Sequence, residues 1–276
     1  NQADVAATGL VCLAVAMGLG RFAFTPLLPM MLHDGLLDLR QGSYLASINY
    51  LGYLLGALAC ALQPWLWARA PGLPLPRFSV LIRIGLLATA VLTLGMALKW
   101  PGAWPALRFA AGLASALVFV YTSGWCLSQL ARLGHPAWGG AIHAGPGAGI
   151  VVSGLAVGAM VSADGSSVLA WLCMAALAGV GAVLAWPTLA QGESSAERLS
   201  AGTPASAGPA PLHPLSEQVL LVLAYGLAGF GYIISATFLP VIARTALPGS
   251  AWLDLFWPVF GLGVVLGALL STRFPT

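Results

Sequence analysis

Eight long runs of apolar residues constrain this chain more than any other feature of its sequence. They cover residues 5–32, 42–68, 78–98, 104–131, 139–162, 166–186, 215–243 and 252–271, and none holds more than one Asp, Glu, Lys or Arg. A helix that crosses the hydrocarbon core of a bilayer needs about 20 such residues, so each run predicts a membrane-spanning helix. Because only 7% of the 276 residues are charged and 59% are hydrophobic, we predict an all-α integral membrane protein.

The rest of the composition excludes several functional classes. The net charge is only +3 and no basic run is interleaved with aromatic residues, so nucleic-acid binding is not expected. The cysteines stand singly in apolar runs, which predicts packing residues rather than a metal site or a disulfide framework; they are Cys12, Cys60, Cys126 and Cys173. The histidines are dispersed, without paired acids or HExxH-type spacing, so neither an enzyme nor a bound cofactor is expected; they are His33, His135, His143 and His213.

The arginines predict the orientation of the chain in the membrane. One side, which includes the N-terminus, holds Arg69, Arg77, Arg83, Arg132, Arg198 and Arg273. The other side holds fewer cations, together with acids: Arg40, Lys99 and Arg244, beside Asp34, Asp38, Asp164 and Asp254. By the positive-inside rule we expect a multi-pass protein of the inner cell membrane with a cytoplasmic N-terminus. The first run is too long for a signal peptide and lacks a small-residue cleavage pattern, so it is expected to be a retained span.

The first apolar run reappears in the seventh. GLGRFAFTPLLP at 18–29 aligns with GFGYIISATFLP at 229–240, and LGYLLGAL at 51–58 aligns at the same offset with LGVVLGAL at 262–269, where six of eight positions are identical. Two separate runs that agree on one offset indicate a duplication. Because six crossings separate the two copies, both have the same orientation. Parallel repeats of this kind are typical of the two halves of major facilitator transporters.

The repeat predicts the domain organisation. Residues 1–186 are expected to form an N-terminal six-helix bundle, and residues 215–276 the first two helices of a second bundle. The segment 187–214 between them is rich in Ser, Ala, Gly and Pro and has no apolar period, which predicts a flexible cytoplasmic linker. Because the chain lacks an initial Met and stops at Thr276, we expect that it holds eight of twelve membrane-spanning helices.

Several motifs carry a resemblance to a known family. GLGRFAFTPLLPMM, followed by SYLASINYLGYLLGAL, resembles the YbfB/YjiJ family of the major facilitator superfamily, and the resemblance covers essentially the whole chain. It implies the major facilitator fold and solute transport. Arg108, Gly112 and Ala114 in LRFAAGLASA resemble a span-four pattern that the superfamily associates with proton coupling. The glycines and Pro146 of HAGPGAGI resemble the span-five motif of proton-driven exporters.

Arg21 is the charged residue that most needs an explanation. It lies near the middle of its run, where an arginine costs roughly 2.5 to 3.5 kcal/mol, so it must face protein or water. Gly18 and Gly20 permit close approach, while Pro26 and Pro29 free backbone carbonyls, so we expect a helix that is kinked or partly unwound beside the charge. Such a place suits a site for a carboxylate or a phosphate. One alternative is a structural Arg21 that pairs with helix-end carbonyls or with an acid in the four spans expected beyond this chain. Another is an Arg21 that snorkels to the membrane interface.

Polar groups in other runs complete the predicted substrate site. Asn49, Tyr53, Tyr121 and Tyr232 are expected to join Arg21. Tyr232 stands where the repeat would place Arg21, and a charge kept in only one copy fits a ligand contact better than a scaffold requirement. No Asp or Glu lies in the centre of any run. The site is therefore expected to be electropositive, which favours an anionic or zwitterionic solute.

Four further residues are predicted to act in coupling or motion. His143 titrates near neutral pH and, with Arg108, is the candidate for proton coupling. Each has a structural alternative, in which His143 binds a carbonyl and Arg108 reaches the membrane interface. Pro146 and Pro240 are predicted kinks or gates, like the glycines and prolines of the first run.

These patterns together predict a secondary active transporter. It is expected to act as a monomer in the lipid bilayer and to move a small organic solute by alternating access, driven by protons. Two alternatives remain open at this point: a passive facilitator or channel, and a proton-driven exporter of hydrophobic compounds.

Overall fold

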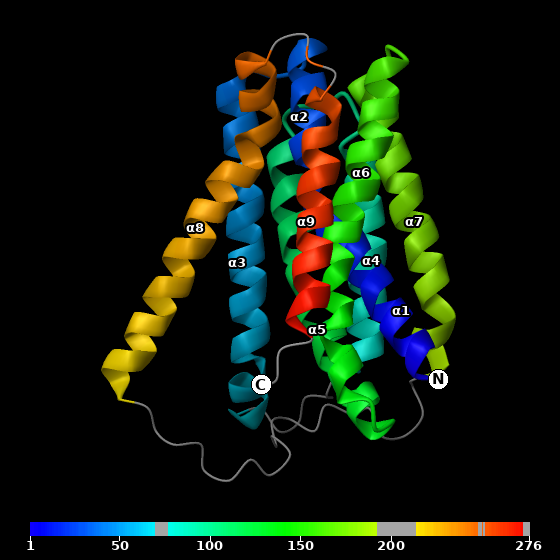
Figure 1. Ribbon diagram of the computed structural model, residues 1–276, viewed down its shortest axis with the longest axis vertical. Helices are drawn as coiled ribbons and strands as arrows, with labels where there is room; N and C mark the ends of the chain where they lie inside the picture. The colour runs from blue at the N-terminus through cyan, green and yellow to red at the C-terminus, as the bar shows by residue number, and fades with distance from the viewer. Residues whose placement is uncertain (70–76, 192–213, 248–249, 251, 273–276) are drawn as a thin grey trace.

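The computed structural model describes residues 1–69, 77–191, 214–247, 250 and 252–272. Every element in this part of the chain is a helix, and the helices run side by side, with α8 at the edge (Figure 1). In chain order they are α1 (Gln2–Leu13), the π-helix η1 (Ala14–Phe22), α2 (Phe24–His33), α3 (Leu39–Arg69), α4 (Phe78–Gly95), α5 (Trp104–Arg132), the short 3-10 segments η2 (Pro136–Gly139) and η3 (Ala141–Ala144), α6 (Gly145–Ser162), α7 (Ser167–Gln191), α8 (Leu215–Ala246), η4 (Leu253–Leu255) and α9 (Phe256–Ser271).

Within the described residues, seven helical segments are long and apolar enough to cross a membrane. The first, Gln2–His33, combines α1, η1 and α2, and the apolar helix α9 is shorter, at 16 residues. The prediction of an all-α protein with about eight apolar helices is therefore confirmed. Two α-helices begin later than the apolar runs predicted for them, which start at residues 139 and 252. Proline lacks an N–H and fits only the first turn of a helix, so α6 starts just before Pro146 and α9 just before Pro258.

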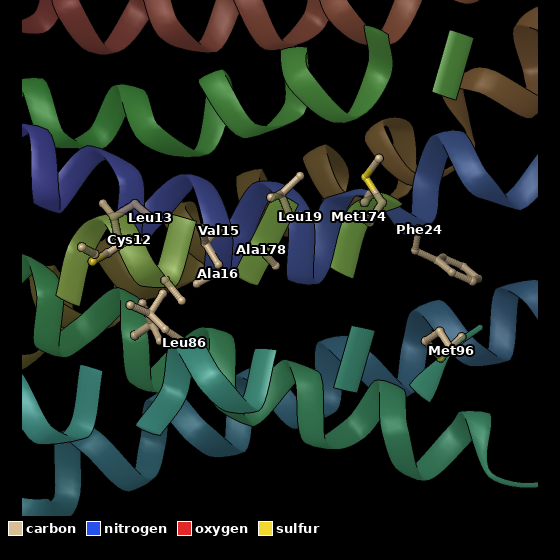
Figure 2. Packing of buried hydrophobic residues seen from close by; sticks show 14 of the residues in the cluster. Cys12, Leu13, Val15, Ala16, Leu19, Phe24, Leu86, Met96, Met174 and Ala178 are labelled. Atoms are coloured by element: carbon tan, nitrogen blue, oxygen red, sulfur yellow. The ribbon is translucent and has the colours of Figure 1, made fainter. Parts of the chain in front are cut away.

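The first span occupies the centre of the bundle. In its most apolar window 67% of the residues are buried, against 33% for α3 and for α4. Figure 2 shows the core around it, where residues of α1 and η1 such as Leu13 and Leu19 lie in one cluster with Leu86 of α4 and Met174 of α7. Apolar burial of this kind positions η1, which carries Arg21, in the interior of the protein.

Glycines let α6 pack closely on the central span and on α9. A Cβ on Gly18 of η1 would overlap the backbone of Gly149 on α6. A Cβ on Gly147, on the same helix, would overlap the backbone of Gly261 on α9. Only residues without a side chain permit such contacts. Helix α6 therefore packs directly on both the first span and α9.

Helix α8 contacts the bundle near one end only. Its buried residues Ala236, Thr237, Pro240 and Ala243 lie in its second half, where α8 contacts α2. The first half of α8 is exposed and leans away from the other helices (Figure 1). The hydroxyls of Tyr50 on α3 and Thr237 on α8 form a hydrogen bond at the contact.

The segment predicted as a linker is described only in part. Helix α7 continues to Gln191, beyond the predicted end of the sixth run at residue 186, and α8 begins at Leu215. Residues 192–213, which include Arg198 and His213, lie outside the described residues, and so does Arg273.

Candidate functional site

The first span changes its helical form around Arg21. It is α-helical to Leu13, π-helical over Ala14–Phe22, and α-helical again from Phe24. A π-helix is rare and is found mostly as short segments at functional sites. Glycine is a poor helix former, and Pro26 cannot donate a hydrogen bond to the carbonyl of Phe22. The structure thus places a wide, irregular turn where the sequence predicts a kink.

Arg21 is buried among aromatic rings. Its side chain is only 6% exposed, and its guanidinium carbon lies 4.0 Å from the ring centroid of Tyr53, 5.1 Å from that of Tyr50 and 5.2 Å from that of Phe22. A cation over aromatic faces is stabilised by the ring quadrupoles. Its Nε has no hydrogen-bond partner among the described residues, and Arg21 forms no salt bridge with them. A positive charge therefore stands in the protein interior without a carboxylate from this part of the chain.

Arg108 of α5 holds the backbone that carries Arg21. Its two terminal nitrogens donate hydrogen bonds to the carbonyl oxygens of Gly20 and Arg21, both at 3.3 Å. Its guanidinium carbon lies 4.6 Å from the ring centroid of Phe24, and the side chain is 2% exposed. Arg108 is thus buried in the bundle, against the first span. One structural alternative for Arg21 was a guanidinium that binds helix carbonyls. In the structure, Arg108 forms such bonds.

Asn49 joins α3 to α5 beside Arg108. It is fully buried, and its Nδ2 donates a 2.7 Å hydrogen bond to the carbonyl oxygen of Arg108. A Cβ on Gly112 of α5 would overlap the backbone around Asn49 and Gly52, so the two helices touch here. The Oδ1 of Asn49 has no partner among the described residues. Asn49 therefore fixes the position of α5, and with it that of Arg108.

Tyr232 and two rings of α9 form a row, which we call the aromatic row. Tyr232 lies on the half of α8 that packs on the bundle. Its ring stacks on Phe260, with centroids 5.9 Å apart, and Phe260 stacks on Trp257, with centroids 5.3 Å apart and an interplanar angle of 12°. Trp257 is 2% exposed, and its Nε1 has no partner among the described residues. The row therefore runs from an exposed ring on α8 to a buried N–H donor on α9.

A buried apolar cluster connects the aromatic row to the surroundings of Arg21. Its buried members come from the first span, α6 and α9, and its partly buried members from α3, α5 and α9: Met17, Phe22, Ile150 and Trp257, with Tyr53, Phe119 and Phe260 packed against them. Arg21, Tyr53 and the aromatic row consequently belong to one site built by six helices: the first span, α3, α5, α6, α8 and α9.

Tyr121 lies away from the surroundings of Arg21, and His143 lies at the edge of the apolar cluster. Tyr121 forms a hydrogen bond with Gln63 and packs on the ring of Phe78. Gln63 follows Asn49 by 14 residues on α3, which at 1.5 Å per residue is roughly 20 Å along the helix. The ring of His143 packs edge-on against Phe119, at 6.0 Å between centroids, so His143 adjoins the apolar cluster through that ring.

The predicted hinge prolines occupy different positions in their helices. Pro26 lies in the first turn of α2 and Pro146 in the first turn of α6. Pro29 and Pro240 lie inside α2 and α8. Of these four prolines, Pro29 and Pro240 are the two that lie inside one α-helix. Each therefore removes a backbone hydrogen bond from the helix in which it lies.

A cavity of about 390 Å³ lies at the end of the bundle where α2 and α8 finish. Its polar lining residues are His33, Asp34, Asp164, Ser166 and Arg244. The carboxylate of Asp34 accepts hydrogen bonds from the backbone N–H of Ser167 at 2.8 Å and from its hydroxyl at 2.6 Å. Asp34 therefore links the end of α2 to the start of α7.

Two aromatic residues of the site were missing from the predicted set. They are Trp257 and Phe260, which lie one turn apart on α9. Residues three apart share a helix face, so the pair forms an aromatic face. That spacing is a signal present in the sequence, although it does not distinguish a site from a lipid-facing surface.

A bundle of apolar helices around a buried arginine that has no carboxylate partner among the described residues is typical of polytopic membrane transporters. The family model described as "Uncharacterised MFS-type transporter YbfB" matches residues 13–275, and the chain belongs to this family. The predicted resemblance to the major facilitator superfamily is thereby confirmed. No curated protein matches the chain.

Proposed function

We propose that this protein is a secondary active transporter that moves a small organic anion or zwitterion by alternating access, coupled to protons. The observation that carries the proposal is Arg21, a buried cation on a π-helix without a carboxylate partner in the described chain. An isolated buried charge is costly unless it is paired. A solute carboxylate that reaches Arg21 supplies the missing partner.

The neighbouring charge favours the same class of solute. Arg108 adds a second buried cation beside Arg21. Its hydrogen bonds go to backbone carbonyls, which stabilise its position without cancelling its charge. A cationic solute would face two like charges in a medium of low dielectric constant. An anion, or a zwitterion bound through its carboxylate, is therefore favoured.

For proton coupling, His143 is the better of the two predicted carriers. Arginine keeps its proton in proteins, so Arg108 serves to hold η1. Histidine changes charge near neutral pH, and His143 adjoins the apolar cluster of the site through Phe119. We propose that protonation of His143 alters the packing of this cluster and so links proton and solute movement.

The proposed setting is the inner cell membrane, with the N-terminus in the cytoplasm. The excess of arginines at the end of the bundle that carries Gln2 supports this orientation. The cavity lined by Asp34 and Arg244 then lies on the outer side. The solute would pass between α8 and the first six spans, and the protein would act as a monomer.

A thermal-unfolding screen of the full protein tests the nature of the solute. Carboxylates, amides and amines that share a carbon skeleton are compared as ligands, first with the wild type and then with Arg21→Gln. We expect carboxylates alone to raise the melting temperature of the wild type, and no rise in Arg21→Gln. Arg40→Gln, which neutralises an exposed arginine, should behave as the wild type. Stabilisation by amines, or unchanged responses in Arg21→Gln, would refute the anion site.

Counterflow in proteoliposomes separates a carrier from a pore. A carrier loaded with unlabelled solute accumulates labelled solute transiently, whereas a passive channel does not. We expect counterflow with the carboxylate found in the screen, and its acceleration by an imposed pH gradient in the wild type but not in His143→Gln. Equilibration without an overshoot would identify a channel.

A further inference from the structure

We infer that the transported anion carries a planar aromatic group, so that the protein is selective for aromatic carboxylates over aliphatic ones of the same size. This inference rests on the proposed anion site at Arg21 and names the class of solute that the site accepts. Its basis is the aromatic row Tyr232, Phe260 and Trp257, together with Tyr53, on which Arg21 lies.

The aromatic row presents an open end beside the charge. Trp257 is buried and Phe260 is partly buried, but Tyr232 is 43% exposed. Tyr232 also lies on the part of α8 that meets the surroundings of Arg21, because Tyr50, whose ring lies beside Arg21, forms a hydrogen bond with Thr237 of α8. Aromatic pairs in offset stacks or edge-to-face contacts are stabilised beyond the burial of their area. A planar ring that stacks beside Tyr232 therefore extends the row, while its carboxylate reaches the guanidinium of Arg21.

One buried donor of the site fits a solute carboxylate. Arg21 Nε is buried and has no partner among the described residues. It is an N–H that cannot accept a hydrogen bond. A carboxylate, with two oxygens and several lone pairs, matches it. A solute group that only donates hydrogen bonds leaves Arg21 Nε unsatisfied.

The chemistry around Arg21 also separates this class from inorganic anions. A doubly charged phosphate or sulfate favours sites where several cations converge. Here Arg108 directs its donors to Gly20 and Arg21 carbonyls, and the surface around Arg21 is aromatic. One guanidinium with flat apolar walls suits a monovalent carboxylate attached to a ring.

The test compares benzoate with cyclohexanecarboxylate, which has the same charge and a similar size but no π-system. Binding of each to the full protein is measured by calorimetry, in the wild type and in Tyr232→Leu, which removes the ring at the open end of the row. We expect the wild type to bind benzoate about three- to tenfold more tightly, the range given by a single aromatic contact. The ratio should fall to about one in Tyr232→Leu and persist in Tyr232→Phe.

Controls distinguish failure of this inference from failure of the proposed function. Phe230→Leu removes an exposed ring of α8 and should keep the ratio. Arg21→Gln should abolish binding of both acids. If both acids bind equally to the wild type and lose binding in Arg21→Gln, the aromatic inference is wrong and the anion site stands. The aromatic inference is also wrong if Tyr232→Leu folds and keeps the wild-type ratio. If neither acid binds the wild type, or if binding survives in Arg21→Gln, both proposals fail.

Discussion

The guanidinium of Arg108 donates a hydrogen bond to the backbone carbonyl of Arg21 over 3.3 Å, so one buried arginine holds the helix that carries the other. The carbonyl of Gly20 accepts a second bond from the same group. The charge of Arg108 is directed at the irregular backbone of η1, whereas the charge of Arg21 is directed at tyrosine rings. In the proposed transporter the two residues therefore have separate roles: Arg108 positions the site, and Arg21 is the proposed contact for the solute.

This division predicts different losses for the two arginines. Arg108→Met should leave the carbonyls of Gly20 and Arg21 without donors, which costs about 1–3 kcal/mol for each buried group. We expect a lower melting temperature together with loss of solute binding. Arg21→Met should abolish binding while its melting temperature stays at the wild-type value or rises, because it removes an unpaired charge. Thermal unfolding in detergent measures both effects, and equal destabilisation by the two variants would contradict the separate roles.

The close contact between the first span and α6 predicts a position-specific effect of added methyl groups. Gly18→Ala should place a Cβ in the backbone of Gly149, and overpacking of this kind costs about 1–3 kcal/mol. Gly229→Ala is the matched control, because Gly229 occupies the equivalent repeat position. A Cβ added at Gly229 would meet no atom of another element within 4 Å among the described residues. It should stabilise α8 by up to about 1 kcal/mol, since alanine is the better helix former. Equal melting temperatures for the two variants would show that the contact does not matter.

Much of the fold could be predicted because it follows from one physical requirement. A bilayer demands long apolar helices, so the runs around Arg21, Asn49 and Arg108 were predicted as spans, and the structure makes them helices. The helix starts at Pro146 and Pro258 were harder, because a short 3-10 segment and an α-helix share the same apolar composition. Local proline chemistry, rather than hydropathy, sets those boundaries.

The candidate site was predictable only where a residue was anomalous in its own run. Arg21 stands out as a charge in an apolar span, and its burial follows from the cost of exposing it to lipid. The separation of Tyr121 from Arg21 could not be predicted, because a run of apolar residues does not fix which helix faces turn toward each other. The stacking of Tyr232 on Phe260 likewise depends on how α8 lies against α9.

Asp34 predicts an acid-sensitive link between α2 and α7. Burial raises the pKa of Asp34, but the hydrogen bonds from Ser167, together with the charge of His33, hold the net pKa below its ordinary value of 3.8. A carboxyl with a lowered folded-state pKa stabilises the protein above its unfolded-state pKa, and this contribution is lost as pH falls through the folded-state pKa. The wild type should therefore lose melting temperature below about pH 4.

Two variants assign that loss to this link. Asp34→Asn should have a lower melting temperature at pH 7 and a smaller further decrease on acidification. Asp164→Asn, which changes another acid of the same cavity, should keep the wild-type decrease. Parallel acid curves for the wild type and Asp34→Asn would mean that another group causes the loss.

The contact between Tyr50 and Thr237 predicts non-additive effects of two conservative substitutions. The hydroxyl of Thr237 donates to the carbonyl of Ile233 at 2.6 Å, so in its bond with Tyr50 the tyrosine is the donor. Tyr50→Phe and Thr237→Val should each lower stability by about 1 kcal/mol. Because both remove the same bond, the double variant should lose little more than either single variant. Melting temperatures of the three variants complete the cycle. Fully additive losses would show that α3 and α8 are not joined by this hydrogen bond.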